Sequence, residues 1–239
     1  MTRRRWIADE VSGNHAALTG EHADHLARVL RVRIGQEFDI ATGDLVRVGR
    51  VSAISSGRVE FDLGEEVSGA SVLPLTLAMA IIKFDRMEWA IEKCTELGVS
   101  RIIPVIARRT DSHLVKAAGK RAERWERVAR EASEQSRRAS PPEISHPITV
   151  KETASLSAPL RILLSESEKA VSMKEALQPA SSVILALGPE GGWANEEEAA
   201  FRQAGWVGAS LGPTILRAET AAIAATAVVL SDLLSLTHR

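Results

Sequence analysis

The chain has 239 residues, of which 45% are hydrophobic, and a formal net charge of -1. These values are typical of a globular protein with a substantial core, and they exclude a strongly basic chain that binds nucleic acid over its whole surface. The single cysteine, Cys94, excludes an intrachain disulfide and a cysteine-rich metal site. The most apolar stretch, residues 221–230, is too short to span a bilayer, and the basic N-terminus lacks the apolar stretch of a secretory signal. We therefore expect a cytoplasmic protein of one large domain or two small ones, with no membrane partner.

The first 70 residues have the pattern of a small β-barrel or β-sheet domain. Short, partly alternating apolar segments are separated by glycine-bearing turns. These segments are Phe38–Ile40, Leu45–Ile54 and Val59–Leu63. Before them, residues 21–30 have the pattern of a short helix that turns Leu26, Val29 and Leu30 inward. His22 and His25 lie in this helix, but no third metal ligand is apparent beside them.

From Pro74 onward, buried-strand and helix patterns alternate, which favours an α/β fold with a largely parallel sheet and helices on both faces. The expected strands are Leu75–Ile82, Arg101–Ile106, Leu160–Leu164 and Ser182–Ala186. Asp85 and Glu88 should cap a helix that runs to Leu97 and ends at Gly98. The expected stripe of this helix contains Cys94, so we expect a buried thiol. Residues 173–177 should form another short helix.

Two glycine-bearing turns, Leu187–Trp193 and Leu211–Ala221, each follow an apolar run and lead into a helix. Asn195, with Glu198 three residues later, has the pattern of a helix N-cap, and Gly205 marks the end of that helix. Loops that follow parallel strands meet at one edge of the sheet, where such sheets bind ligands. The two turns should therefore face one pocket, although glycines that only make tight turns would give the same spacing.

Residues 101–140 form the basic part of the chain, with eleven Lys or Arg against five acidic residues. Residues 1–67 contain nine Arg against eleven Asp or Glu. Lys120, Arg124, Arg127 and Arg130 recur at helical spacing and could follow the phosphates of a nucleic acid. A solvated helix face with Glu–Arg pairs is the alternative. The candidate RNA-contacting residues are Arg5, Arg28, Arg31, Arg109, Arg124, Arg127, Arg130 and Arg138.

The two turns, LGPEGGW at 187–193 and LGPTILRAETA at 211–221, resemble the signature of the RsmE family. These are N3-uridine methyltransferases of 16S ribosomal RNA that belong to the SPOUT class. Residues 25–31 and 131–138 resemble the same family. The resemblance implies a PUA-like RNA-binding domain over residues 1–70 and a SPOUT domain over 71–239 with a C-terminal trefoil knot. It also implies S-adenosylmethionine as the methyl donor, a homodimer and the small ribosomal subunit as partner.

By this resemblance, the donor pocket is assigned to the two turns and to the end of a preceding strand. The assigned residues are Ser165, Glu166, Leu187, Gly188, Pro189, Gly191, Gly192, Leu211, Gly212, Ile215, Leu216, Thr220 and Ala221. The chain has no dinucleotide fingerprint, no Walker loop and no zinc spacing, so we expect no metal.

Methyl transfer to uridine N3 requires alignment of donor and acceptor and removal of the imide proton. Arg217 is the first candidate to stabilise the negative charge on the uracil ring, and Glu190 or Glu219 could accept the proton. Simple helix capping is the alternative role for Glu219. Methylation at C5 is disfavoured because that reaction needs a cysteine nucleophile. A SPOUT enzyme that methylates a ribose 2′-oxygen and a non-catalytic RNA-binding protein remain as rival interpretations.

Overall fold

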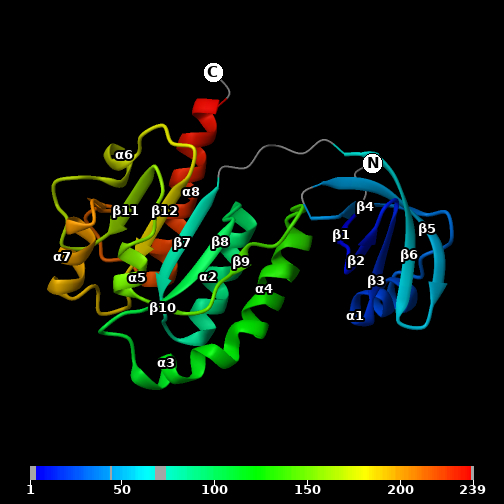
Figure 1. The fold of residues 1–239 in the computed structure, drawn as a ribbon, viewed down its shortest axis with the longest axis horizontal. Coiled ribbons are helices and arrows are strands. Elements are labelled where there is room, and N and C mark those ends of the chain that lie inside the picture. Colours follow the sequence, from blue (N-terminus) through cyan, green and yellow to red (C-terminus); the bar gives the residue numbers. More distant parts are fainter. Residues whose placement is uncertain (1–3, 44, 68–73, 238–239) are drawn as a thin grey trace. The chain divides into compact units, whose positions relative to one another are not determined.

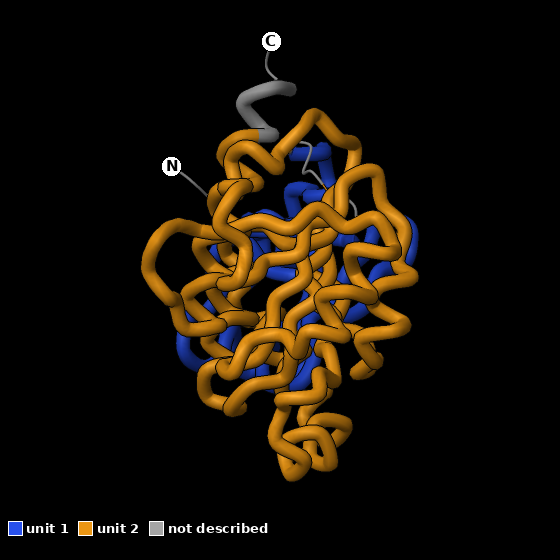
Figure 2. The backbone as a smooth tube through the Cα atoms, turned by 90° about the vertical axis from the view of Figure 1, so that its left-hand side faces the viewer, with its two compact units in different colours: residues 1–71, 133–140 blue, residues 72–132, 141–239 orange. Residues whose placement is uncertain are grey.

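The chain divides into two compact units, which Figure 2 shows in blue and orange. Unit 1 contains residues 1–71 and 133–140, and unit 2 contains residues 72–132 and 141–239. The structure, a computed structural model, describes residues 4–43, 45–67 and 74–237, with side chains up to residue 232. The predicted boundary between residues 70 and 71 lies outside the described residues. Within the described parts, no helix has both the length and the apolar character that a membrane span requires.

Unit 1 contains a six-stranded sheet in the order β1-β4-β5-β6-β3-β2 (Figure 1). Its strands are β1 (Arg5–Ile7), β2 (Glu10–Ser12), β3 (His15–Thr19), β4 (Glu37–Ala41), β5 (Val46–Ser55) and β6 (Arg58–Glu66). The β1–β4 pair is parallel and the other ladders are antiparallel. The sheet curls into a half-barrel around Leu18, Ile40 and Phe61, which are fully buried. The three strands expected in this region are confirmed as β4, β5 and β6.

The helix expected over residues 21–30 is divided in two. The segment α1 (Gly20–Asp24) is α-helical, and the next five residues, His25–Val29, form a π-helical turn. In this turn the Leu30 amide donates to the His25 carbonyl at 3.1 Å, a bond between residues five apart. The wider turn changes the helical period, so Leu26 is buried whereas Val29 is 65% exposed. The prediction that Val29 points inward was therefore wrong.

Unit 2 is built on a seven-stranded sheet in which every ladder is parallel. Its strands are β7 (Leu75–Ala80), β8 (Arg101–Ile106), β9 (Glu143–Ile144), β10 (Ile148–Thr149), β11 (Leu160–Leu164), β12 (Val183–Leu187) and β13 (Val207–Ala209). The order is β10-β8-β7-β12-β11-β13, and β9 also pairs with β8. The four strands expected from the apolar runs are confirmed as β7, β8, β11 and β12.

Helices cover both faces of this sheet (Figure 1). They are α2 (Phe84–Leu97), α3 (Ser112–Ala118), α4 (Ala122–Gln135), α5 (Val150–Ala154), α6 (Met173–Ala176), α7 (Asn195–Gln203) and α8 (Ala218–Thr237). Side chains alternate across each strand, so that in β12 Leu185 joins the core under α2 and α8 whereas Ala186 joins the core under α5 and α7. Both faces are buried, as is usual for a parallel sheet.

Two of the expected helix caps are wrong. Ala194, not Asn195, is the N-cap of α7, and its amide donates to Glu197 Oε2 at 2.8 Å. Lys83 is the N-cap of α2, which places Asp85 inside the first turn. The expected C-terminal glycines are correct, because Gly98 and Gly205 have φ angles of +118° and +83°.

Helix α8 packs mainly on α2 and buries Ala222, Ala225 and Val229. Thr220 and Val228 are exposed on its other side. The side chains of residues 233–237 lie outside the described residues, so part of the expected dimer helix, residues 221–234, is not described. The trefoil knot stays a prediction.

Candidate donor pocket

A cavity of about 330 Å³ opens in unit 2 at the carboxyl ends of β11, β12 and β13. Its walls are the loops that follow these strands, together with the start of α8 and one side chain from α2. The lining residues at the ends of β11 and β12 and in the loops after them are Leu164, Ser165, Glu166, Lys169, Leu187, Gly188, Pro189, Glu190, Gly192 and Trp193. The remaining lining residues are Arg86, Ala209, Ser210, Leu211, Gly212, Pro213, Thr214, Ile215, Leu216, Arg217, Ala218 and Ala221. The expectation that the two glycine turns face one pocket is confirmed.

The first turn is held to the sheet by Trp193. Its side chain is buried, and its Nε1 donates to the carbonyl oxygen of Leu164, at the end of β11, at 3.1 Å. The Trp193 ring also packs against Phe201 of α7 at a centroid distance of 5.1 Å. A Cβ atom on Gly188 would lie 3.2 Å from the Trp193 amide nitrogen, so glycine allows the tryptophan to approach this closely. Contacts within unit 2 therefore hold the turn to the sheet.

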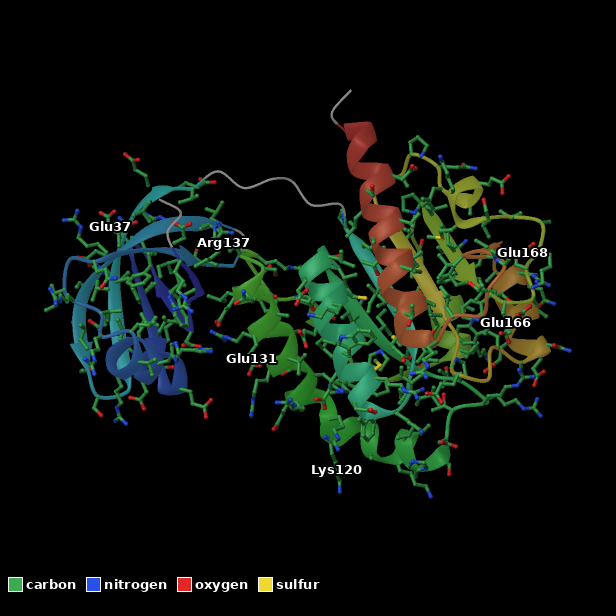
Figure 3. All side chains as sticks on the ribbon, turned by 180° about the vertical axis from the view of Figure 1, so that it is seen from behind. Glu37, Lys120, Glu131, Arg137, Glu166 and Glu168 are labelled. Atoms are coloured by element: carbon green, nitrogen blue, oxygen red, sulfur yellow. The ribbon has the colours of Figure 1, made fainter. Side chains whose placement is uncertain are left out.

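The loop after β11 is tied to α7 through a shared carboxylate. The Ser165 hydroxyl donates to Glu198 Oε1, and the Ser167 hydroxyl donates to Glu198 Oε2 at 2.9 Å. Arg202 also pairs with this carboxylate, at 3.2 Å. Figure 3 labels Glu166 and Glu168 in the same loop. Glu198 thus fixes the pocket wall, whereas Glu197 accepts from the amide of the N-cap residue Ala194.

Gly191 and Thr220 are the two predicted donor-binding residues that do not line the cavity. A Cβ atom on Gly191 would face the Arg109 side chain at 3.5 Å. Arg109 itself donates to the Gly191 carbonyl oxygen at 2.6 Å, so this predicted RNA-contacting residue supports the first turn. A side chain is less well tolerated at Gly192 than at Gly191, because the φ of Gly192 is +68° and a Cβ atom there would lie 2.8 Å from Glu166 Oε1.

The three predicted catalytic residues occupy different environments. Arg217 and Glu190 line the cavity and are exposed. The Glu219 side chain is 3% exposed, does not line the cavity, and has a buried Oε2 with no hydrogen-bond partner among the described residues. Arg86 of α2 forms ion pairs with both Glu190 and Glu219. Sequence reasoning missed Arg86, because no local pattern marks a residue more than 100 positions from its partners.

The predicted RNA-contacting arginines of unit 1 are only partly at the surface. Arg28 and Arg31 are exposed, although Arg28 pairs with Asp24 at 3.5 Å. The Arg5 side chain is 17% exposed, pairs with the buried Asp39 at 3.8 Å and donates to the Arg137 carbonyl. Arg138 is half-buried, and burial lowers its pKa to about 10. The RNA contacts predicted for Arg5 and Arg138 stay a prediction, and both side chains are partly covered by the protein.

In the basic segment of unit 2, Arg127 is exposed on α4. Arg124 pairs with Glu88 of α2 at 3.2 Å, and Arg130 is half-buried. Lys120, labelled in Figure 3, lies on a 3-10 turn before α4 rather than on the helix. The expected phosphate-tracking stripe is thus shorter than its spacing indicated.

Cys94 is buried under α8, 3.6 Å from the Thr226 hydroxyl, and burial raises its pKa to about 12. The expectation of a buried thiol is confirmed, and such a thiol is not available as a nucleophile. Among the described residues, no group of three or more His, Cys, Asp or Glu is placed to hold a metal ion.

Comparison with known proteins agrees with this fold. The RNA methyltransferase domain family matches residues 70–230 of the chain. The ribosomal RNA small subunit methyltransferase E of Synechocystis is 35% identical over 89% of this chain and 71% of the relative. The crystal structure of a protein of that name from Neisseria gonorrhoeae, bound to S-adenosyl methionine, has 29% identity and a TM-score of 0.85. It covers 97% of this chain and 98% of the relative.

A methyltransferase from Legionella pneumophila, solved in complex with the same cofactor, has 28% identity and a TM-score of 0.83 over 97% of this chain and 98% of the relative. The parallel sheet and its glycine-lined pocket thus define an RNA methyltransferase domain. The chain belongs to the ribosomal RNA small subunit methyltransferase E, or RsmE, family of enzymes.

Proposed function

We propose that this protein uses S-adenosylmethionine to methylate N3 of one uridine in the 16S RNA of the small ribosomal subunit. The observation that carries the proposal is the cavity at the ends of β11, β12 and β13, whose walls are the two family motifs. Two similar solved proteins are bound to this donor. We further infer that the enzyme works in the cytoplasm.

The cavity fits such a donor in size and in chemistry. Its volume of about 330 Å³ lies within the usual range of small-molecule sites. Apolar side chains such as Leu211, Ile215 and Leu216 would hold the adenine, and the backbone of Gly188 and Gly192 would supply polar groups close to the ligand. When bound, the donor supplies an electrophilic methyl group. The chain would need no metal and no covalent intermediate for this transfer.

Arg217 and Glu190 are the proposed catalytic residues. Both line the cavity, so both could reach an acceptor base placed at its mouth. Glu190 would accept the N3 proton of uridine, and the Arg217 guanidinium would stabilise the negative charge that develops on the ring carbonyl oxygens. Glu219 is assigned a structural role instead, because its carboxylate is buried and does not line the cavity.

RNA contacts are proposed for exposed arginines of both units, with Arg28 and Arg31 in unit 1 and Arg127 in unit 2. Each phosphate contact releases counterions, so RNA binding should weaken as salt increases. We also propose a homodimer formed through the exposed side of α8. Light scattering that gives a monomer mass at working concentration would contradict the dimer.

The decisive experiment combines the protein with labelled donor and small subunits that lack the modification. After digestion of the RNA, mass spectrometry should identify 3-methyluridine. Label in 2′-O-methyl or 5-methyl nucleosides, or no label, would reject the assignment.

Two variants test the roles separately. Arg217→Ala should retain donor and RNA binding but slow methyl transfer by about 100-fold or more, which is typical for loss of one charge-stabilising donor. Arg127→Glu should weaken RNA binding and reduce its salt dependence while leaving donor affinity unchanged. Full turnover by Arg217→Ala would reject its catalytic role.

A further inference from the structure

One side chain of α2 connects the two loops that form the pocket. Arg86 is 28% exposed and lines the cavity. Its Nη1 pairs with Glu190 Oε1 in the turn after β12, and its Nε lies 3.7 Å from Glu219 Oε1 in the first turn of α8. The planar guanidinium presents donors in several directions, so it can contact both carboxylates at once.

The two contacts have different energetic roles. Glu219 is a buried carboxylate, and a buried charge is costly unless an opposite charge lies beside it. Its Oε2 has no hydrogen-bond partner among the described residues, and the Arg86 guanidinium lies beside its Oε1 as the opposite charge. The Glu190 side chain is 42% exposed, and an exposed ion pair contributes little to the stability of the fold. The buried contact therefore fixes the guanidinium, and the exposed contact fixes the loop.

We infer that Arg86 is a positioning residue that clamps the glycine turn 188–193 to the start of α8 and thereby holds the donor pocket in its binding-competent shape. The inference rests on the proposed function, because it assigns the donor to this pocket. All three residues of the clamp belong to unit 2. It also gives Glu219 a purpose: its buried carboxylate keeps the Arg86 guanidinium at the pocket wall.

The clamp predicts that donor affinity and fold stability can be separated. Arg86→Gln should weaken the binding of S-adenosylmethionine by about tenfold or more, and it should also lower the thermal stability because Glu219 is left buried without its cation. Glu190→Gln should weaken the binding of the donor severalfold with almost no change in thermal stability. The double variant Arg86→Gln/Glu219→Gln removes the isolated buried charge, so it should regain stability but not donor affinity.

These variants are compared by calorimetry with S-adenosylmethionine and by thermal unfolding. Lys93→Gln is the matched control. Lys93 lies on the same helix and pairs with Glu92 and Glu96, each at 2.7 Å. It does not line the cavity. The Lys93→Gln variant should change neither donor affinity nor thermal stability. Arg86→Lys should restore part of the donor affinity, because lysine keeps the charge but lacks the fork that reaches both carboxylates.

A double-mutant cycle of Arg86→Gln with Glu190→Gln supplies the remaining readout. If the clamp acts through Glu190, the combined loss of donor affinity should be clearly smaller than the product of the single losses. Full donor affinity in Arg86→Gln, or affinity that returns together with stability in the Arg86→Gln/Glu219→Gln variant, would overturn the clamp while the proposed function stands. A wild-type protein that does not bind the donor would overturn both.

Discussion

The two loops of the pocket differ in how firmly the protein holds them. In the turn after β12, Trp193 is buried, the Gly192 amide donates to the Pro189 carbonyl at 2.8 Å, and the Gly191 carbonyl accepts from Arg109. In the loop 211–217, by contrast, Ile215 is 83% exposed. Residues 212–215 are all exposed. One wall is bound to the core of unit 2, and the other wall contains four consecutive exposed residues, 212–215.

This difference indicates that the two loops contribute differently to fold stability and to donor binding. A preformed wall binds a ligand without an ordering cost, whereas an exposed loop loses conformational freedom when it closes on a ligand. The turn after β12 should therefore contribute to fold stability as well as to donor binding. Loop 211–217 should contribute to donor binding alone.

The largest effect should come from Trp193→Ala, which removes the anchor of the first turn. Loss of this buried ring and of its bond to Leu164 should lower the free energy of unfolding by about 3–5 kcal/mol. Urea denaturation measures this loss. Trp89→Ala is the control, because Trp89 is 48% exposed on α2 and its loss should change stability by only about 0.5 kcal/mol. Equal effects of the two changes would show that the turn is not anchored by Trp193.

An intermediate effect is expected from Gly192→Ala. The residue has a φ of +68°, and a Cβ there would lie 2.8 Å from Glu166 Oε1, which must then move. The backbone strain should cost about 1–2 kcal/mol, and donor affinity should fall by about tenfold. Calorimetry of Gly191→Ala gives the comparison. At Gly191 the added Cβ meets Arg109 at an ordinary 3.5 Å, so we expect a much smaller loss.

The smallest effect on stability should come from Ile215→Ala in the exposed loop. Because the side chain makes little contact with the protein, the free energy of unfolding should change by about 0.5 kcal/mol or less. Donor affinity should nevertheless fall by about tenfold, since a ligand that covers an isoleucine gains about 1.5 kcal/mol. A change in stability without a change in donor affinity would reverse the distinction between the two loops.

The sequence predicted the parallel sheet of unit 2 well. Strands β8 and β11 have the predicted bounds, and β12 is displaced by one residue. Strands buried on both faces are continuous apolar runs, such as Val183–Leu187. The shorter strands β9, β10 and β13 were not predicted, because two or three residues carry too little pattern.

Prediction was weaker in unit 1, where β1, β2 and β3 were missed. Glu10–Ser12 is entirely exposed, so its residues show no apolar alternation. The π-helical turn His25–Val29 was also missed. An apolar pattern of helical period does not reveal where hydrogen bonds join residues five apart instead of four. The partial burial of the Arg5 and Arg138 side chains was not predicted, because the residue type indicates charge but not burial.

The sequence by itself determined the two glycine turns, the alternation of strands and helices and the family, since all three depend on residues that are close together in the chain. Only the tertiary structure decided that Glu198 binds Ser165 and Ser167, that Arg109 supports Gly191, and that Arg86 joins Glu190 to Glu219. Each of these contacts joins residues that are 31 to 133 positions apart. A charged side chain can choose among many partners, and the packing of the sheet and its helices selects the one that lies within reach.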